Sequence, residues 1–69
     1  MADHYYVNMN AQANGDHEVH KGSCTRLPDV MNRKYLGLFD SCAPAVREAK
    51  LSYWQSNGCY YCSILCHTT

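Results

Sequence analysis

Apolar and polar positions in the first third of the chain alternate in a way that predicts β-strands. Residues 5–9 are rich in aromatic and β-branched side chains, and residues 17–21 alternate with period two. The dipeptide Asn14-Gly15 lies between these segments and is typical of tight turns that join two antiparallel strands. The pattern therefore predicts a β-hairpin over residues 5–21.

A third strand is predicted after a polar linker. Residues 22–33 contain glycine, proline, aspartate and asparagine, and residues 34–39 are apolar on both faces. Such a strand is typical of a central position or one beneath a helix. We expect Gly37 within it to mark a β-bulge or a close approach of backbone.

The next pattern predicts a helix over residues 43–56. Asp40 and Ser41 supply helix-capping side chains, and Pro44 stands in the first turn, where a missing N–H has little cost. At 100° per residue one stripe contains Cys42, Ala45, Val46, Ala49 and Tyr53. Asn57-Gly58 is predicted to end the helix. Leu51 and Trp54 lie outside the stripe, and we expect Ile64 and Leu65 to cover them.

These elements predict one α+β domain with the order β-β-β-α. The simplest packing is a three-stranded antiparallel meander with a C-terminal helix on one face. Residues 1–4 are predicted to be a disordered terminus, residues 5–57 to form the β-β-β-α unit, and residues 58–69 to form a cysteine-rich tail.

Composition narrows the functional classes. The chain has 69 residues, with six basic and six acidic side chains, so no basic excess favours nucleic-acid binding. No apolar run approaches the roughly 18 residues needed to span a membrane, and the N-terminus lacks a secretory signal pattern, which predicts a cytoplasmic location. A chain this short buries a small core, so we expect a staple, a metal or a partner to add stability.

Five cysteines are the main candidate chemistry. Cys59 and Cys62 form a C-x2-C pair, which lets two thiolates reach one tetrahedral ion from a single turn. In the predicted meander, the end of the helix returns to the end of the second strand, where Cys24 follows. We therefore expect a structural zinc held by three cysteines and one further tail residue. The predicted ligands are Cys24, Cys59, Cys62 and either Cys66 or His67.

Two other residues have predicted roles near this site. His20 ends the second strand close to Cys24 and is a reserve ligand. Cys42, at the start of the helix, would lie roughly 20 Å from Cys59 at 1.5 Å per helical residue, so we expect a packed core thiol there. Disulfides among the tail cysteines or with Cys24, and inert thiols, are the alternatives to a metal.

Function is predicted to be structural rather than enzymatic. The C-x2-C pair follows a helix C-terminus, whereas a redox-active pair gains thiolate character at a helix N-terminus. No glycine-rich phosphate loop is present, and no histidine is assigned to Cys42 as a catalytic base. We expect a small structural or interaction module, with a thiol-based redox or metal-handling protein as the alternative. Its partner would be another protein or a second copy joined at a sheet edge.

Several of these segments also resemble known proteins. The segments around Tyr5-Tyr6, Asn14-Gly15 and Tyr35-Leu36-Gly37, together with the tail pattern C-x2-C-x3-C-H, resemble a group of short bacterial proteins of unknown function over nearly the whole chain. More loosely, residues 5–54 are similar to the YegP-type β-β-β-α domain, whose function is also unknown. That resemblance implies an α+β fold and possible pairing of sheets, and it implies no catalytic residues.

Overall fold

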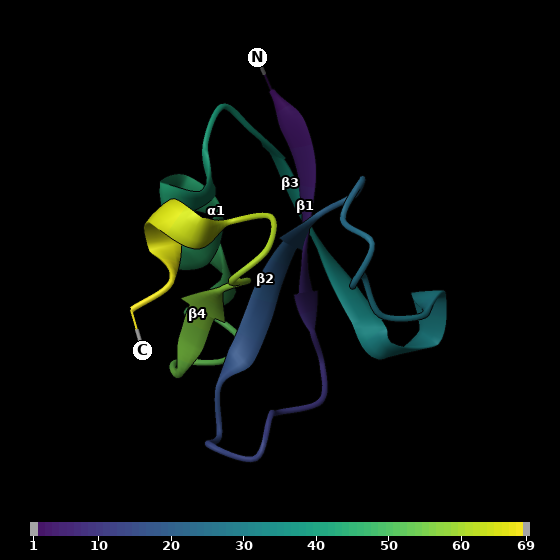
Figure 1. Ribbon diagram of the computed structural model, residues 1–69, viewed down its shortest axis with the longest axis vertical. Helices are drawn as coiled ribbons and strands as arrows, with labels where there is room; N and C mark the ends of the chain where they lie inside the picture. Colours follow the sequence, from purple (N-terminus) through teal and green to yellow (C-terminus); the bar gives the residue numbers. More distant parts are fainter. Residues whose placement is uncertain (1, 69) are drawn as a thin grey trace.

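The computed structural model describes residues 2–68, which form a mixed four-stranded sheet with one α-helix and two short 3-10 helices (Figure 1). The predicted α+β class is confirmed. In chain order the elements are β1 (Asp3–Asn8), β2 (His17–Lys21), η1 (Val30–Asn32), β3 (Arg33–Phe39), α1 (Cys42–Ala49), β4 (Ser56–Gly58) and η2 (Ile64–Cys66).

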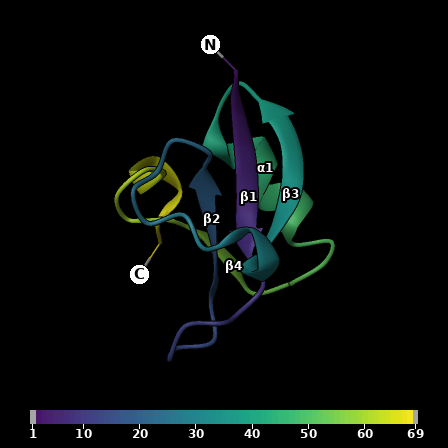
Figure 2. The same cartoon turned by 90° about the vertical axis from the view of Figure 1, so that its right-hand side faces the viewer.

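The predicted three-stranded antiparallel meander is wrong, because the sheet has four strands and is mixed. The sheet has the order β3-β1-β2-β4, with β1 antiparallel to both β2 and β3, and β4 parallel to β2. Residues 22–32 carry the chain from β2 past β1 to the far side of β1, on the face opposite α1 (Figure 2). This crossover leaves the outer side of β2 free for β4. A meander would have placed β3 there.

The predicted hairpin and bulge are confirmed. β1 pairs with β2 in the register Tyr5↔Lys21 to Val7↔Val19. Gly15 has φ +93°, a conformation that glycine adopts without penalty, and it closes the turn. In the β1–β3 pair the register shifts between Tyr5 and Tyr6, so that Gly37, with φ +137°, lies at a β-bulge.

The first strand begins earlier than the sequence predicts. Asp3 and His4, which were expected to lie in a disordered terminus, pair with Phe39 and Leu38 of β3. The His4 ring nitrogen Nδ1 lies 2.9 Å from the Tyr35 hydroxyl oxygen. The cross-strand partner supplied by β3 is what orders this end of the chain.

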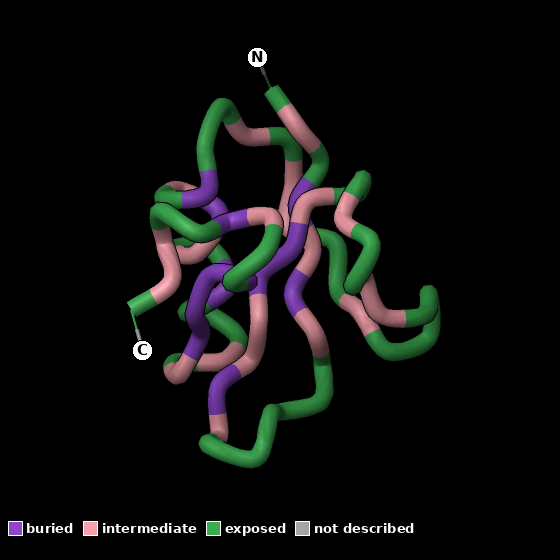
Figure 3. Tube along the Cα trace, viewed as in Figure 1, coloured by how far each residue is buried: buried purple, intermediate pink, exposed green. Residues whose placement is uncertain are grey.

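The predicted helical stripe packs on the sheet. Cys42, Ala45 and Ala49 are buried against a core that includes Tyr5, Val7 and Val19, and Val46 and Tyr53 lie at its edge. Buried positions lie in β1, β2, α1 and β4 and in the first part of the tail, whereas most of the loops before β2 and β3 are exposed (Figure 3). Small side chains at the helix face let the backbone of α1 approach the sheet closely.

The helix ends at Ala49, seven residues before its predicted end. The N–H of Leu51 bonds the Glu48 carbonyl, and the N–H of Ser52 bonds the Ala49 carbonyl, so the last turn tightens. The chain then extends, and β4 pairs with the first three residues of β2 instead of capping the helix. Asn57-Gly58 is thus a strand segment, because pairing satisfies backbone groups that are buried at this position.

The predicted cover over the helix flank is also absent from the described residues. Leu51 and Trp54 are each 80% exposed, and Leu65 is 96% exposed. The tail instead returns toward the start of α1, where a disulfide joins Cys42 to Cys66 with 6.2 Å between the Cα atoms. Among residues 2–68, no helix combines the length and apolar character that crossing a bilayer requires.

The tail crosses the end of β4 at Gly58, where a side chain would not fit. A Cβ atom built on Gly58 would lie 2.6 Å from the Cβ of Cys66 and 2.7 Å from the Ser63 carbonyl oxygen. Both neighbours are tied down, one by the disulfide and one by the turn after Cys59, so neither moves freely.

We therefore expect Gly58→Ala to lower the free energy of unfolding by about 2 kcal/mol through overpacking, measured by urea denaturation. Gly22→Ala is the matched control, because its Cβ would lie 3.3 Å from a Tyr6 ring carbon and no closer to any other atom outside its neighbours. Equal losses in the two variants would contradict the proposed close crossing at Gly58.

Candidate metal centre

The candidate site lies where the carboxyl ends of β2 and β4 meet. Because these strands are parallel, the residues that follow them leave the sheet at the same edge. His20 is near the end of β2, and a turn closed by the Cys24 N–H and the Lys21 carbonyl brings Cys24 back toward it. Cys59 comes directly after β4, and its N–H donates to the Val19 carbonyl at 2.9 Å.

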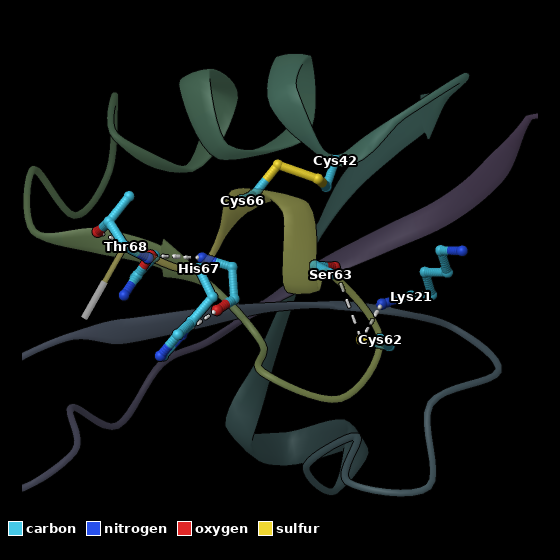
Figure 4. The surroundings of a disulfide bond; sticks show 9 residues. Lys21, Cys42, Cys62, Ser63, Cys66, His67 and Thr68 are labelled. Atoms are coloured by element: carbon cyan, nitrogen blue, oxygen red, sulfur yellow. Dashed lines mark hydrogen bonds between the residues drawn. A yellow bond between two sulfur atoms is a disulfide. The ribbon is translucent and has the colours of Figure 1, made fainter.

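A second turn adds the fourth side chain. The Ser63 N–H donates to the Cys59 carbonyl at 2.9 Å, so the chain bends tightly over residues 59–63 and presents Cys62 beside Cys59. Figure 4 shows Cys62 on this bend, pointing toward the backbone nitrogen of Lys21. The site is thus assembled by two turns, each of which follows one of two paired strands.

The four side chains have the spacing of a tetrahedral metal site. One ligand atom from each of His20, Cys24, Cys59 and Cys62 lies within 4.8 Å of the other three. The sulfurs of Cys24 and Cys59 are 3.9 Å apart. Around an ion with metal–sulfur bonds of about 2.3 Å, tetrahedral geometry puts two sulfurs about 3.8 Å apart. The cluster therefore needs little rearrangement to surround one ion.

Backbone N–H groups point at all three sulfurs. Lys21 donates to Cys62 Sγ at 3.3 Å, Arg26 to Cys24 Sγ at 3.4 Å and Tyr61 to Cys59 Sγ at 3.4 Å. Such donors stabilise negative charge on sulfur, and they orient the ligands before a metal arrives. The turns that place the cysteines also supply these donors.

His20 has a buried imidazole, and one of its two nitrogens makes no hydrogen bond within the described chain. Its side chain is 1% exposed, and Nδ1 has no hydrogen-bond partner within the described chain. Its other nitrogen, Nε2, lies 3.7 Å from Glu18 Oε1. Burial lowers the pKa of His20, which favours the neutral ring that binds metals. A carboxylate behind the second nitrogen is typical of metal-binding histidines.

Burial also governs the thiols. It raises the pKa of Cys59 and of Cys62, so that both are protonated at neutral pH in the absence of a cation. A metal ion binds thiolate, and its charge replaces these protons. Without a metal these thiols are therefore neutral, and they become thiolates when a cation binds.

The structure brings together three of the residues that the sequence nominates and separates two others. Cys24, Cys59 and Cys62 meet, and His20, the reserve ligand, completes the group. The sulfur of Cys66 is bonded to Cys42, so it is not available to the cluster. His67 points its Nδ1 at the Gly58 carbonyl oxygen, 3.0 Å away.

The expectation that Cys42 is a packed free thiol is wrong. The tail doubles back through η2 and delivers Cys66 to the start of α1, as Figure 4 shows. The sequence indicated His20 because it lies four residues before Cys24, at the end of a predicted strand. One turn after that strand brings both side chains to the same site. No comparable local signal pairs Cys42 with Cys66, because 24 positions separate them.

Comparisons with known proteins find no match to this chain, whether among protein-family models, curated proteins or solved structures. The resemblances to a group of short bacterial proteins and to the YegP-type domain therefore stay predictions. The function proposed below therefore follows from the residues of the site.

The two histidines near the tail give a direct test of the ligand set. We expect His20→Ala to weaken binding of Co²⁺ at least about 100-fold, because it removes a ligand from a buried site. His67→Ala should leave affinity within about 3-fold, since the imidazole lies against the Gly58 carbonyl and the Tyr60 ring and outside the four-residue cluster. The visible absorption of tetrahedral thiolate-bound Co²⁺ reports both affinities, and the reverse order would assign the ligand to His67.

Proposed function

We propose that this protein is a small structural or interaction module stapled by one zinc ion, which His20, Cys24, Cys59 and Cys62 bind. The observation that supports the proposal is the convergence of four ligand atoms within 4.8 Å at the ends of two parallel strands. Three soft sulfurs and one imidazole are a donor set typical of zinc.

The closed donor set favours a structural role over a catalytic one. Catalytic zinc sites have three protein ligands and an open position for water or substrate, whereas structural sites have four protein ligands. Here all four ligands come from the chain, and Cys59 and His20 are almost fully buried. The proposed ion therefore holds segments together and is not positioned to act on a substrate.

The size of the core explains why such a staple would matter. The buried apolar cluster consists of six side chains, two of which are alanines: Tyr5, Val7, Val19, Cys42, Ala45 and Ala49. The tail is attached at two places. Its Cys66 is bonded to Cys42 of the helix, and its Cys59 and Cys62 belong to the candidate site. A metal would tie the tail to the segment after β2, most of which is exposed.

The state of the cysteines bears on the compartment in which the protein works. A cytoplasmic location stays a prediction from the N-terminal sequence. The disulfide between Cys42 and Cys66 favours an oxidising environment, because disulfides are rare in reducing compartments. The zinc site itself is compatible with both, provided that its thiols remain reduced.

Chelation tests the proposal and separates it from the thiol-redox alternative. With free zinc at about 100 times its dissociation constant, binding adds about 2.7 kcal/mol, which corresponds to a melting temperature higher by roughly 10 °C or more. We expect a strong chelator to abolish this increment, and native mass spectrometry to show about one zinc per chain before chelation. A redox protein without a metal would melt at the same temperature with and without chelator.

We also propose that a second copy is a partner through the edge of β3. Among the described strands, β3 has a neighbour only on its β1 side, and its exposed side chains include Tyr35 and Leu38, at 51% and 57% exposure. Long unprotected edge strands are ready to pair with another chain. The two edges would form a continuous sheet across the dimer.

Sedimentation velocity tests this dimer. We expect the weight-average mass to rise with concentration, and Leu38→Lys to shift the midpoint at least about 10-fold upward, because a lysine on the edge opposes pairing. Leu65→Lys is the control, since Leu65 is exposed in the tail and away from β3. A monomer at every concentration would contradict the proposal.

A further inference from the structure

Two sulfurs of the candidate site are in contact but differ in exposure. Cys59 is fully buried, whereas Cys24 is half-buried on an exposed segment, and their sulfurs are 3.9 Å apart. We propose that Cys24 and Cys59 are a peroxide-sensitive thiol pair whose oxidation to a disulfide expels the metal. The inference rests on the proposed zinc site and specifies how that site is regulated.

Geometry allows the bond to form with a local movement. A disulfide needs the sulfurs about 2.05 Å apart, so the gap has to close by about 1.9 Å. The sulfur of each cysteine accepts one backbone N–H, but Cys59 is fully buried and its own N–H donates to the Val19 carbonyl of β2, which anchors it to the sheet. Cys24 is flanked by the exposed residues Gly22, Ser23 and Thr25. The movement therefore belongs to the segment that carries Cys24.

The chemistry balances with hydrogen peroxide as the oxidant. The thiolate of Cys24 attacks one peroxide oxygen, the O–O bond breaks, and a sulfenic acid and one water form. The Cys59 sulfur then attacks the Cys24 sulfur and displaces the second water. In total, two thiols lose two electrons and two protons, and one peroxide becomes two waters. Burial makes Cys59 the resolving thiol, since peroxide does not reach it first.

Cys62 is the thiol that remains. Its sulfur accepts the Lys21 N–H, and it lines a cleft of about 560 Å³ together with residues from β1, β2, the start of α1 and the tail. A bond between Cys59 and Cys62 would instead consume this sulfur and leave Cys24 as the free thiol. Closing the bond to Cys24 leaves that hydrogen bond in place. The cleft keeps the remaining thiol accessible to solvent.

Oxidation would replace one staple by another. It removes two of the four zinc ligands, and His20 and Cys62 alone do not surround the ion. The new disulfide joins the segment after β2 to the residue after β4, which are the two segments that the metal connects. The oxidised protein would therefore stay folded without metal, and its melting temperature would no longer respond to a chelator.

Peroxide treatment of the zinc-loaded full chain tests the inference. We expect zinc content to fall at least about 10-fold as ligands are lost. Peptide mapping should link Cys24 to Cys59, leave the Cys42 to Cys66 bond unchanged and find Cys62 as the one alkylated cysteine. Zinc retention, a bond between Cys59 and Cys62, or oxidation without a new crosslink would each overturn the inference.

Two variants keep the outcome interpretable. Cys62→Ser retains the proposed pair, so its metal-free form should still give the Cys24 to Cys59 bond with peroxide. Cys24→Ser removes the exposed member and should give no crosslink to Cys59. If the native chain binds no zinc but forms this bond, the metal proposal fails and the thiol pair stands. If zinc binds and no bond forms, the thiol pair alone fails.

Discussion

The parallel pairing of β4 with β2 is the interaction on which the rest of the structure depends. Its register places Ser56 opposite His17 and Gly58 opposite Val19, so that the chain leaves β4 beside the end of β2. Cys59 is then bonded through its N–H to Val19. Without this short strand, the tail would have no fixed direction, and neither the cysteine cluster nor the disulfide to α1 would form.

A polar network supports that pairing from the other end. The buried carboxylate of Asp16 accepts hydrogen bonds from the side chains of Asn14, Gln55 and Asn57. The His17 ring stacks on Tyr53, with 4.1 Å between the ring centroids. These contacts join the hairpin turn to the residues that lead into β4. Buried polar groups stabilise only when they are paired, and here their partners come from both segments.

The tail is held at two places by two kinds of sulfur chemistry. The Cys42 to Cys66 bond connects the later part of the tail covalently to the helix, whereas Cys59 and Cys62 bring the earlier part to the cluster around His20. Gly58 lies between them, in direct contact with the Cys66 backbone. A chain with so small a core concentrates its stabilising interactions in this segment, and five cysteines therefore divide into one bonded pair and three that gather at the site.

The local pattern of residues was sufficient to predict part of the fold and part of the candidate site. The Asn14-Gly15 turn, the Gly37 bulge and the apolar stripe of α1 follow from residue chemistry and periodicity. The convergence of Cys24 with Cys59 and Cys62 was also predicted, although from a meander that the chain does not form. Either topology brings the end of β2 and the start of the tail to one end of the sheet, so the convergence does not depend on the meander.

The remaining features depend on contacts between segments far apart in the sequence. Ser56–Gly58 has no strand pattern of its own, and it is a strand because β2 offers unpaired backbone groups. The same pairing accompanies the early end of the helix and the return of the tail that brings Cys66 to Cys42. It also leaves the Nδ1 of His20 buried without a hydrogen-bond partner in the described chain. The sequence by itself determined which residue types were available as ligands and that three strands and then a helix follow one another along the chain. Tertiary structure decided which of them meet, because buried backbone pairing and close packing depend on partners that no local pattern encodes.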